Sequence, residues 1–485
     1  MKIAFVQFLY YEYLGIMYLS ACLKERGHDV EVFIAPEGKG TEGFARELAA
    51  AKPDVVAFSV MSGSEEMALS IARELRKRSP IYTVMGGPHV TASPEIITND
   101  GVDCVCLGEA ERSLAAVVDS LAAGAVPREI AGAWFNIDGE IVRNDVAPLV
   151  RDLGTVPHPD RALYRDKYRP LRRRRAAFIS GRGCPYGCSF CSIPSVRQLF
   201  RGKGPFVRQR SVADVIAEMR EVRDVFGITT AYFEDDIFIM DRDWVLEFCE
   251  VYPREVGLPF SCHIRADRAT DEVIGALARA KCTNVSFGIE TGGAERREVL
   301  LHKEVSDRQI AACAALLRKH GIRFRTLNML GLPGESLADA FRTVDLNARI
   351  DADYPWCSLF QPLPGTELWD RCIAENLFEG GVPLLQPSFF KDSPIRLTNK
   401  NEIVNLQKLF YFAVKFPGLR RLIRRAIRLR PNAGFDFLFL LSHAWIYARS
   451  ESLSLVDLVQ IGSRNLGRYL PRSAARRGKG GPSGP

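Results

Sequence analysis

The sequence lacks an apolar run long enough to cross a membrane, and it lacks a strong excess of one charge. Its most apolar segment, residues 435–448, is interrupted by Asp436, Ser442 and His443, and a spanning helix needs ~20 apolar residues. The opening MKIAFVQFLYYEYLG places tyrosine and glutamate where a signal peptide has its apolar core. The net charge is only +7, which gives no reason to expect a nucleic acid as partner. We therefore expect a cytoplasmic protein without a transmembrane segment.

The chain also lacks a fixed-period repeat and the compositional signs of disorder. Hydrophobic residues make up 47% and charged residues 25% of its 485 positions, as in an ordinary globular protein. This composition excludes a mostly disordered chain, a collagen-like chain and a small disulfide-stapled scaffold. The length predicts about three domains.

In residues 1–125, short apolar runs alternate with helical patterns. Strand-like runs occupy residues 2–8, 28–35, 54–60, 81–87 and 104–109, and helical patterns occupy residues 15–26 and 64–78. This alternation predicts a doubly wound parallel sheet, so we expect an α/β first domain of the Rossmann-like, flavodoxin-like kind. Ligands bind such sheets beyond the carboxyl ends of the strands, which here carry residues 59–63, 86–89 and 108–109.

The later parts of the chain follow a different pattern. Residues 126–175 predict a hairpin around Asp138 and Gly139, followed by a linker that leads into the second domain. We interpret its arginine run, 172–175, as a solvated connector, with contact to an anionic ligand as the alternative. Six strand–helix units in residues 176–370 predict a partial (β/α)6 barrel of the TIM type, with its chemistry at the strand carboxyl ends. The predicted strands are 176–180, 229–233, 259–265, 284–289, 324–329 and 356–361.

The chain ends in a mainly helical region, residues 371–470, and a basic, glycine-rich tail, residues 471–485, that we expect to be disordered. Residues 419–429, LRRLIRRAIRL, form a strongly basic amphipathic pattern. We interpret it as a helix that packs its apolar face on the barrel and leaves its arginines in water. The alternative is a helix that lies on a membrane surface or holds an anionic substrate.

Three of the 12 cysteines are tightly spaced, in the segment GRGCPYGCSFCSIP. Cys184, Cys188 and Cys191 form a C-x3-C-x2-C pattern, and in a reducing compartment clustered cysteines indicate metal binding or catalysis. Three thiolates on one loop can hold three irons of a [4Fe–4S] cluster and leave the fourth iron open to a substrate or cofactor. The alternative is a zinc site, for which the loop offers no obvious fourth ligand.

This segment resembles the cysteine loop of the radical S-adenosylmethionine (SAM) superfamily. The loop follows the first predicted barrel strand, as in that family, and Phe190 occupies its usual aromatic position. The resemblance covers most of residues 176–370. It implies that Cys184, Cys188 and Cys191 are catalytic cluster ligands and that the open iron chelates SAM. Cofactors supply this chemistry, and the protein positions and shields them.

Further barrel segments match the positions at which the family contacts SAM. They are TAYFEDDIF at 230–238, SFGIETG at 286–292, NMLGLPGES at 328–336 and QPLPGT at 361–366. Ordinary strand-to-helix turns are the alternative interpretation of each segment taken alone. Arg265 and Asp267 are weaker candidates for the same site. The resemblance implies SAM contacts by Phe190, Glu234, Asp235, Asp236, Ser286, Glu290 and Leu332.

Residues 1–125 resemble the cobalamin-binding domain that precedes many radical SAM barrels. The segments that match are 14–33, 54–63, 84–95 and 101–111. The D-x-H-x-x-G motif of other cobalamin methyltransferases is missing, because neither His28 nor His89 follows an aspartate at that spacing. We expect His89 to contact the nucleotide tail or to sit in a turn. A flavodoxin-like fold without its ligand is the alternative. The resemblance implies cobalamin contacts by Tyr10, Leu14, Gly15, Ser59, Met61, Ser62, Gly86, Gly87, His89, Gly108 and Glu109, with Tyr10, Tyr11, Tyr13 and Leu14 over the lower face of the corrin.

Together the two resemblances imply a cobalamin-dependent radical SAM enzyme, and most closely a C-methyltransferase that acts on an unactivated carbon of a small molecule or natural product. Two SAM molecules are then used per turnover: one methylates cobalamin, and the other yields a 5′-deoxyadenosyl radical that abstracts hydrogen before methylcobalamin donates its methyl group. The substrate is a small molecule, anionic or apolar, and the electron comes from an external reductant of the flavodoxin or ferredoxin type.

Two other classes of function stay open at this point. Relatives with the same architecture perform rearrangement, ring contraction or oxidative cyclisation without methyl transfer. A non-enzymatic cobalamin sensor or an iron–sulfur electron carrier is the alternative outside enzymes, and failure to cleave SAM under strong reduction would favour it.

Overall fold

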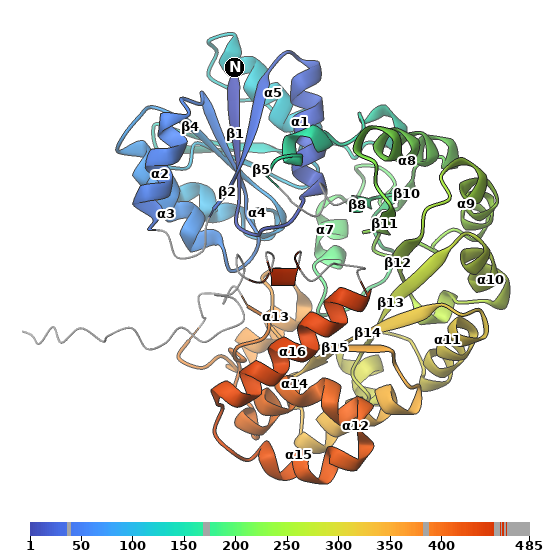
Figure 1. Ribbon diagram of the computed structural model, residues 1–485. Helices are drawn as coiled ribbons and strands as arrows, with labels where there is room; N and C mark the ends of the chain where they lie inside the picture. The colour runs from blue at the N-terminus through green and yellow to red at the C-terminus, as the bar shows by residue number, and fades with distance from the viewer. Residues whose placement is uncertain are drawn as a thin grey trace, which may run out of the picture.

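The computed structural model describes residues 1–35, 40–167, 175–381 and 388–450, together with positions 456, 458, 459 and 462. An N-terminal α/β domain, a curved strand–helix domain and a layer of C-terminal helices lie against one another (Figure 1). The predicted tail, 471–485, lies outside the described residues. In the part of the chain that is described, no helix is long and apolar enough to cross a membrane.

The N-terminal domain is built on a seven-stranded sheet with the order β2-β1-β3-β4-β5-β6-β7. Its first five strands are parallel, so the predicted Rossmann-like fold is confirmed. The strands are β1 (Lys2–Gln7), β2 (Asp29–Ile34), β3 (Val55–Ser59), β4 (Tyr82–Gly86), β5 (Cys104–Cys106), β6 (Ala133–Ile137) and β7 (Glu140–Arg143). The helices are α1 (Leu14–Glu25), α2 (Thr41–Ala50), α3 (Glu65–Arg76), α4 (Pro88–Ala92) and α5 (Glu111–Ala122).

The predicted hairpin is the pair β6–β7, and it belongs to the N-terminal sheet. β6 pairs antiparallel with β5, with Cys104 opposite Phe135, and β7 pairs antiparallel with β6. The sheet therefore extends beyond residue 125, as far as Arg143. Phe135 is fully buried, and the side chain of Trp134 donates a hydrogen bond to the Asn144 carbonyl at 2.9 Å, so both strands are anchored where they join the parallel part.

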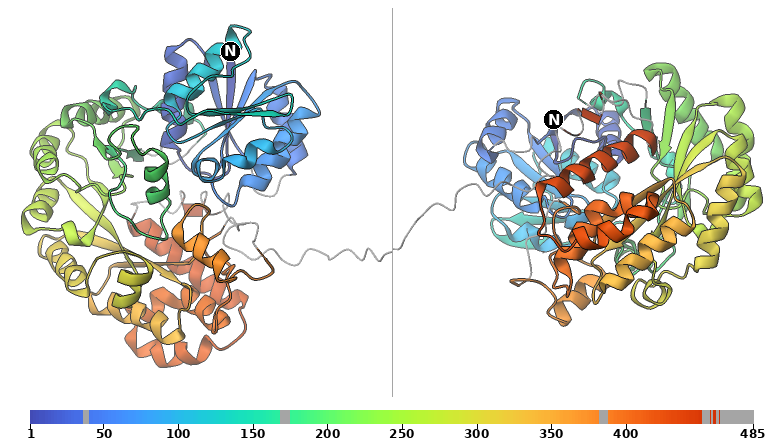
Figure 2. Two further views of the ribbon diagram at one scale, coloured as in Figure 1. Left: turned by 180° about the vertical axis from the view of Figure 1, so that it is seen from behind. Right: turned by 60° about the horizontal axis from the view of Figure 1, so that its bottom comes forward.

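The second domain contains six parallel strands in the order β15-β14-β13-β12-β11-β8. Each strand pairs with its chain neighbour and helices cover the outer face (Figures 1 and 2), so the predicted partial (β/α)6 barrel is confirmed. The strands are β8 (Arg175–Phe178), β11 (Thr230–Phe233), β12 (Phe260–Ile264), β13 (Cys282–Glu290), β14 (Arg323–Leu330) and β15 (Tyr354–Leu359). The helices are α8 (Val212–Phe226), α9 (Arg242–Glu255), α10 (Asp271–Arg279), α11 (Asp307–Lys319), α12 (Leu337–Arg349) and α13 (Glu367–Ala374).

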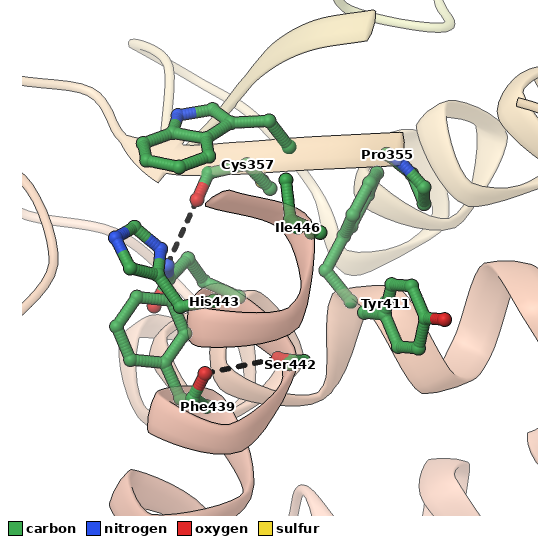
Figure 3. Close-up of a pocket in the computed structure, with 10 residues that line it drawn as sticks. Pro355, Cys357, Tyr411, Phe439, Ser442, His443 and Ile446 are labelled. Carbon is green, nitrogen blue, oxygen red and sulfur yellow. Dashed lines mark hydrogen bonds between the residues drawn. The ribbon is translucent and has the colours of Figure 1, made fainter. Parts of the chain in front are cut away.

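Helices α14 (Lys400–Lys415), α15 (Arg420–Ala426) and α16 (Ala433–Ser450) form the C-terminal layer. Helix α14 packs on α12 and on the edge strand β15, and α16 packs on α14 and β15. The inner face of α16 carries Phe439, Ser442, His443 and Ile446, which line a small pocket with residues of β15 and α14 (Figure 3). The predicted helical C-terminal region is thus confirmed, and it covers the open edge of the barrel sheet.

One residue of the arginine run departs from its interpretation as a solvated connector. Arg175 is only 7% exposed, because it is the first residue of β8, and its guanidinium lies 5.1 Å from the ring centroid of Tyr232. The interpretation is therefore wrong for this residue. Residues 172–174 lie outside the described part of the chain.

A buried ionic network fixes the linker to the barrel. Arg161, in the linker, donates to the Ala177 carbonyl on β8 and to a Glu218 carboxylate oxygen on α8, both at 2.7 Å. Arg210 donates to the other oxygen of Glu218. All three side chains are at most 4% exposed. A charged network this deep depends on complete pairing, since an unpaired buried charge is costly.

Replacing Glu218 with alanine is expected to lower the free energy of unfolding by about 3–5 kcal/mol, because buried Arg161 loses its carboxylate partner and Arg210 loses one of two, Asp214 being the other. Urea denaturation followed by circular dichroism measures the loss. The control is Glu255→Ala, which breaks an exposed pair with Arg220 and is expected to cost less than about 1 kcal/mol. Equal losses in the two variants would contradict a structural role for the network.

Candidate active site

The cysteine loop lies between β9 (Gly181–Arg182) and α7 (Ile193–Leu199), directly after the first barrel strand. β9 pairs antiparallel with β10 (Arg208–Gln209). Gly183 has a φ of +91°, and a Cβ there would lie 2.3 Å from the Phe206 carbonyl oxygen. Only glycine fits this close approach of two backbones. The local sequence therefore forms a tight loop that carries the three cysteines close together along the chain.

The three thiols of this loop are partly exposed, whereas eight of the nine other cysteines are buried. Burial raises the pKa of Cys184, and it raises that of Cys191 to about 11; the negative charges of Asp236 and of the neighbouring loop cysteines act in the same direction. The thiols are thus close enough to sense one another's charge. They have the donor chemistry that iron–sulfur clusters require.

Arg265, at the carboxyl end of β12, supplies a positive charge beside the loop. Its guanidinium lies 3.6 Å from the ring centroid of Tyr186 and 3.9 Å from the sulfur of Cys188, and its charge lowers the pKa of Cys184. A fixed cation favours deprotonated thiols, which are the form that binds iron. Among the described residues no three histidine, cysteine or acidic side chains group so as to hold a single metal ion.

The three carboxylates after β11 have three different environments. Glu234 accepts a hydrogen bond from the hydroxyl of Tyr11 in the N-terminal domain, and Asp236 is exposed. Asp235 is 4% exposed, and it accepts bonds from the backbone and hydroxyl of Ser180 and from the Gly181 N–H. Burial raises its pKa to about 6. Asp235 therefore ties the cysteine loop to β11, and its contact with SAM stays a prediction.

Strand β13 carries two of the other predicted SAM residues, one at its middle and one at its carboxyl end. Ser286 is buried and accepts a hydrogen bond from Arg325 at 3.1 Å. Glu290 has a φ of +66° and forms a buried ion pair with Lys303 at 2.7 Å. A Cβ on Gly288 would meet the charged ends of both members of that pair, so a larger residue there would have to displace the ion pair.

Leu332 and Phe190 lie in one apolar cluster, although 142 positions separate them in the chain. Leu332 is fully buried in the cluster, and Phe190, from the cysteine loop, packs against it. The segment at 328–336, which matches a SAM-contacting position of the family, therefore touches the cysteine loop. A buried carboxylate, that of Glu335, holds the turn of this segment by accepting hydrogen bonds from the N–H groups of Gly331 and Leu332.

Glu335 is expected to make the stability of the protein depend on pH. Burial raises its pKa from 4.5 to about 7, so the folded state holds the proton more tightly than the unfolded chain does. The free energy of unfolding then falls as pH rises from 4.5 to about 7, by up to about 3 kcal/mol. Glu335→Gln keeps the acceptor and should flatten this slope in urea titrations at several pH values. The same slope in the variant would contradict the assignment.

The predicted cobalamin residues occupy the carboxyl edge of the N-terminal sheet. Ser59 and Gly86 end β3 and β4. Gly87 has a φ of +103°, and a Cβ there would lie 2.8 Å from the Val60 carbonyl oxygen. Met61 is 40% exposed, and its sulfur accepts a hydrogen bond from Tyr13 at 3.3 Å. This edge is therefore a surface of backbone and small side chains that a flat ligand can approach.

His89 is the second residue of α4, directly after β4, and its ring nitrogen is 3.1 Å from the Ser62 hydroxyl. Burial lowers its pKa. The contact of His89 with the nucleotide tail stays a prediction. Gly15 is exposed in the first turn of α1, with open space around its Cα.

Two of the aromatic and apolar residues expected over the corrin are buried. Tyr10 and Leu14 are 4% and 3% exposed and belong to the hydrophobic core, and Tyr11, in the loop after β1, donates a hydrogen bond to Glu234. The contact of Tyr10 and Leu14 with the corrin stays a prediction.

A charged clamp, formed by Glu109, Arg182 and Arg208, joins the N-terminal domain to the cysteine loop. Arg208 donates to both carboxylate oxygens of Glu109, one of them at 3.0 Å, and Arg182 lies 3.6 Å from Glu109 and 2.7 Å from Glu111. The arginines lower the pKa of Glu109, although its burial acts in the opposite direction. Glu109, a predicted cobalamin contact, is therefore engaged between the domains.

Gly108 makes the same junction close-packed. Its φ is +66°, and a Cβ there would lie 2.2 Å from the ring of Phe200, the residue that follows α7. The loop after β5 thus rests on the helix that begins two residues after Cys191. Sequence reasoning missed Phe200, Arg182 and Arg208, because nothing in their local sequence marks a contact with residues 71 to 99 positions away.

The fold and the site define a protein with a cobalamin-type Rossmann-like domain docked on a cysteine-loop barrel. Residues 7–118 match the model of the B12 binding domain, and residues 178–346 match that of the radical SAM superfamily. The chain belongs to the radical SAM superfamily, among the members that carry a B12-binding domain before the barrel. It is a radical SAM enzyme, and its cofactors are a [4Fe–4S] cluster, SAM and cobalamin.

Known proteins resemble the chain over most of its length. An uncharacterised methyltransferase of Pyrococcus horikoshii is 27% identical over 370 residues, which cover 75% of this chain and 79% of the relative. Cytidylyl-2-hydroxyethylphosphonate methyltransferase of Streptomyces wedmorensis is 24% identical over 459 residues, 82% of each chain. The structure of the radical SAM methyltransferase TsrM from Kitasatospora setae, with cobalamin and a [4Fe–4S] cluster bound, superposes with a TM-score of 0.67 at 18% identity and covers 95% of this chain and 99% of that one.

Proposed function

We propose that this protein transfers a methyl group from SAM to an unactivated carbon of a small molecule and uses two SAM molecules per turnover. One observation carries the proposal: the carboxyl edges of the two sheets face each other. Tyr11, at the end of β1, hydrogen-bonds to Glu234 at the end of β11, and Gly108 rests on Phe200 after α7. Both folds place their ligands at these edges, so the two sites share one space.

The chain's own residues prepare this space for charged ligands. When bound, cobalamin supplies a methyl carrier and the cluster supplies the electron that cleaves SAM. Cys184, Cys188 and Cys191 hold the cluster, and Arg265 keeps a positive charge beside Cys188. Asp236 is the exposed carboxylate whose charge reaches Cys184 and Cys191, which suits it to hold the cationic amino group of SAM.

Methyltransferase relatives support transfer of a methyl group. The substrate that we propose is a small molecule, and the electron donor is an external one-electron reductant of the flavodoxin or ferredoxin type. The electron donor is part of the proposal because a cluster in the barrel must be reduced before it can cleave SAM.

The test is incubation of the reconstituted protein with SAM that carries a deuterated methyl group and a low-potential reductant. Mass spectrometry of the recovered cobalamin is expected to show the deuterated methyl group, together with S-adenosylhomocysteine and 5′-deoxyadenosine. In the variant Cys188→Ala, labelled cobalamin and S-adenosylhomocysteine should still form, whereas 5′-deoxyadenosine should not. If 5′-deoxyadenosine forms while cobalamin stays unlabelled, the protein performs radical chemistry without methyl transfer.

A further inference from the structure

The surface around α15 is basic over a long stretch of chain. Between Glu402 and Asp436 the sequence has eight lysines and arginines and no acidic residue. Lys408, Lys415 and Arg420 pair with Asp436, Asp351 and Asp345. The other five are exposed and have no acidic partner among the described residues: Arg421, Arg424, Arg425, Arg428 and Arg430.

Next to these arginines runs a contiguous apolar strip, defined as Trp445, Tyr411, Phe412, Phe416, Leu419 and Leu422. Trp445 of α16 hydrogen-bonds to Tyr411 of α14, and ring contacts continue the strip along α14 at centroid distances of 5.6 and 6.2 Å. The backbone turn from Phe416 to Leu419 then carries it onto α15. Leu422 is 63% and Phe416 48% exposed, so the strip faces outward.

The exposed leucines do not belong to the face with which α15 packs on the protein. Ile423 and Ile427 are at most 5% exposed and join the cluster with α12 and α14. Leu419 and Leu422 are one helical turn apart and point away from that cluster, and Arg421 and Arg425 flank them one turn apart. The interpretation of α15 as a packed helix with solvated arginines therefore accounts for its isoleucines but not for its leucines.

Helix α16 shows the same division into an inner and an outer face. Phe439, Ser442, His443 and Ile446 point inward to β15 and α14 (Figure 3). Phe437, Leu441 and Trp445, spaced four residues apart, are 61%, 51% and 47% exposed. The guanidinium of Arg449 lies 4.6 Å from the Trp445 ring centroid. An apolar outer stripe beside arginines thus recurs on the neighbouring helix.

We propose that this surface docks the protein on an anionic lipid bilayer. Leucine, phenylalanine and tryptophan side chains that project between arginines have the composition of interfacial helices, which sit at the boundary of headgroups and acyl chains. Arginines beside them are attracted by anionic headgroups. An exposed apolar strip of this length is unusual for a surface that stays in water. The surface belongs to the C-terminal helices and uses none of the residues assigned to the cluster, SAM or cobalamin, so its test is separate from that of the proposed methyl transfer.

The test is flotation of the full-length protein with vesicles of phosphatidylcholine and phosphatidylglycerol, compared with vesicles of phosphatidylcholine alone. We expect binding to the anionic vesicles only. Leu419→Ser with Leu422→Ser removes the apolar part, and Arg421→Gln, Arg425→Gln and Arg428→Gln together remove the charge. Each set is expected to lower the bound fraction at least tenfold at equal thermal stability.

A matched control removes three exposed arginines elsewhere, through Arg46→Gln, Arg254→Gln and Arg308→Gln, and should bind as the unaltered protein does. Failure of the unaltered protein to bind anionic vesicles overturns the proposal. So does loss of binding in the control set, which would indicate attraction to net charge alone. A dimer that Leu419→Ser with Leu422→Ser dissociates, with no vesicle binding, would assign the strip to contact between two copies of the chain.

Discussion

Replacing Cys188 with alanine is expected to abolish cluster assembly and to lower 5′-deoxyadenosine formation by at least about 1000-fold. This corresponds to an activation barrier about 4 kcal/mol higher. The three thiols lie on one tight loop, held by Gly183 against Phe206 and by Asp235 against β11. None of the other nine cysteines lies on this loop, and eight of them are buried. Iron and sulfide analysis with product chromatography measures both effects.

The matched control for this experiment is Cys22→Ala. Cys22 is the one cysteine outside the loop that is partly exposed, and it lies on α1 of the other domain. The control is expected to keep full iron content and full SAM cleavage. Full iron content in Cys188→Ala would show that the loop does not hold the cluster.

Replacing Glu109 with glutamine is expected to lower methyl transfer roughly 100-fold while leaving SAM cleavage nearly unchanged. Its carboxylate joins the N-terminal domain to Arg208 and Arg182, which flank the cysteine loop. A small displacement between reacting centres costs on the order of 100-fold in rate. Cleavage of SAM needs only the barrel, whereas methyl transfer to a substrate needs the two domains held in a fixed relative position. The ratio of methylated product to 5′-deoxyadenosine measures this uncoupling.

The control for the clamp is Glu140→Gln, which breaks an exposed ion pair with Arg128 within the N-terminal domain and should leave the ratio unchanged. Arg208→Gln should reproduce the effect of Glu109→Gln, and the double variant should add little to either, since both remove one interaction. If cleavage and methyl transfer fell by equal factors in Glu109→Gln, the clamp would be structural and not a positioning device.

Local signals made most of the fold predictable. Residues 212–226 form α8, because the Ser211 hydroxyl caps its first turn and Gly227 adopts the left-handed conformation that ends it. Apolar runs that alternate with helical patterns located the barrel strands to within a few residues. Helix α2 was not predicted, and the pairing of the β6–β7 hairpin with β5 depends on contacts about thirty residues apart, which local periodicity does not encode.

The site was predictable only as far as its motifs reach. The C-x3-C-x2-C spacing carries the cluster ligands in one stretch of sequence, so Cys184, Cys188 and Cys191 could be named from it. The environments of Asp235 and Glu109 could not, since each is set by a partner on a distant segment: Ser180 on the cysteine-loop side and Arg208 on β10. Tyr10 and Leu14 face the core for a similar reason, because the turn after β1 decides which side chains point inward.

The most direct test of a shared two-cofactor site is the cofactor content of the protein purified without oxygen and reconstituted with iron, sulfide and hydroxocobalamin. The account predicts about four irons and one cobalamin on the same chain, with an electron paramagnetic resonance signal of the reduced cluster that changes when SAM is added and disappears in Cys184→Ala. A reducible cluster without retained cobalamin, or a signal that SAM leaves unchanged, would contradict it.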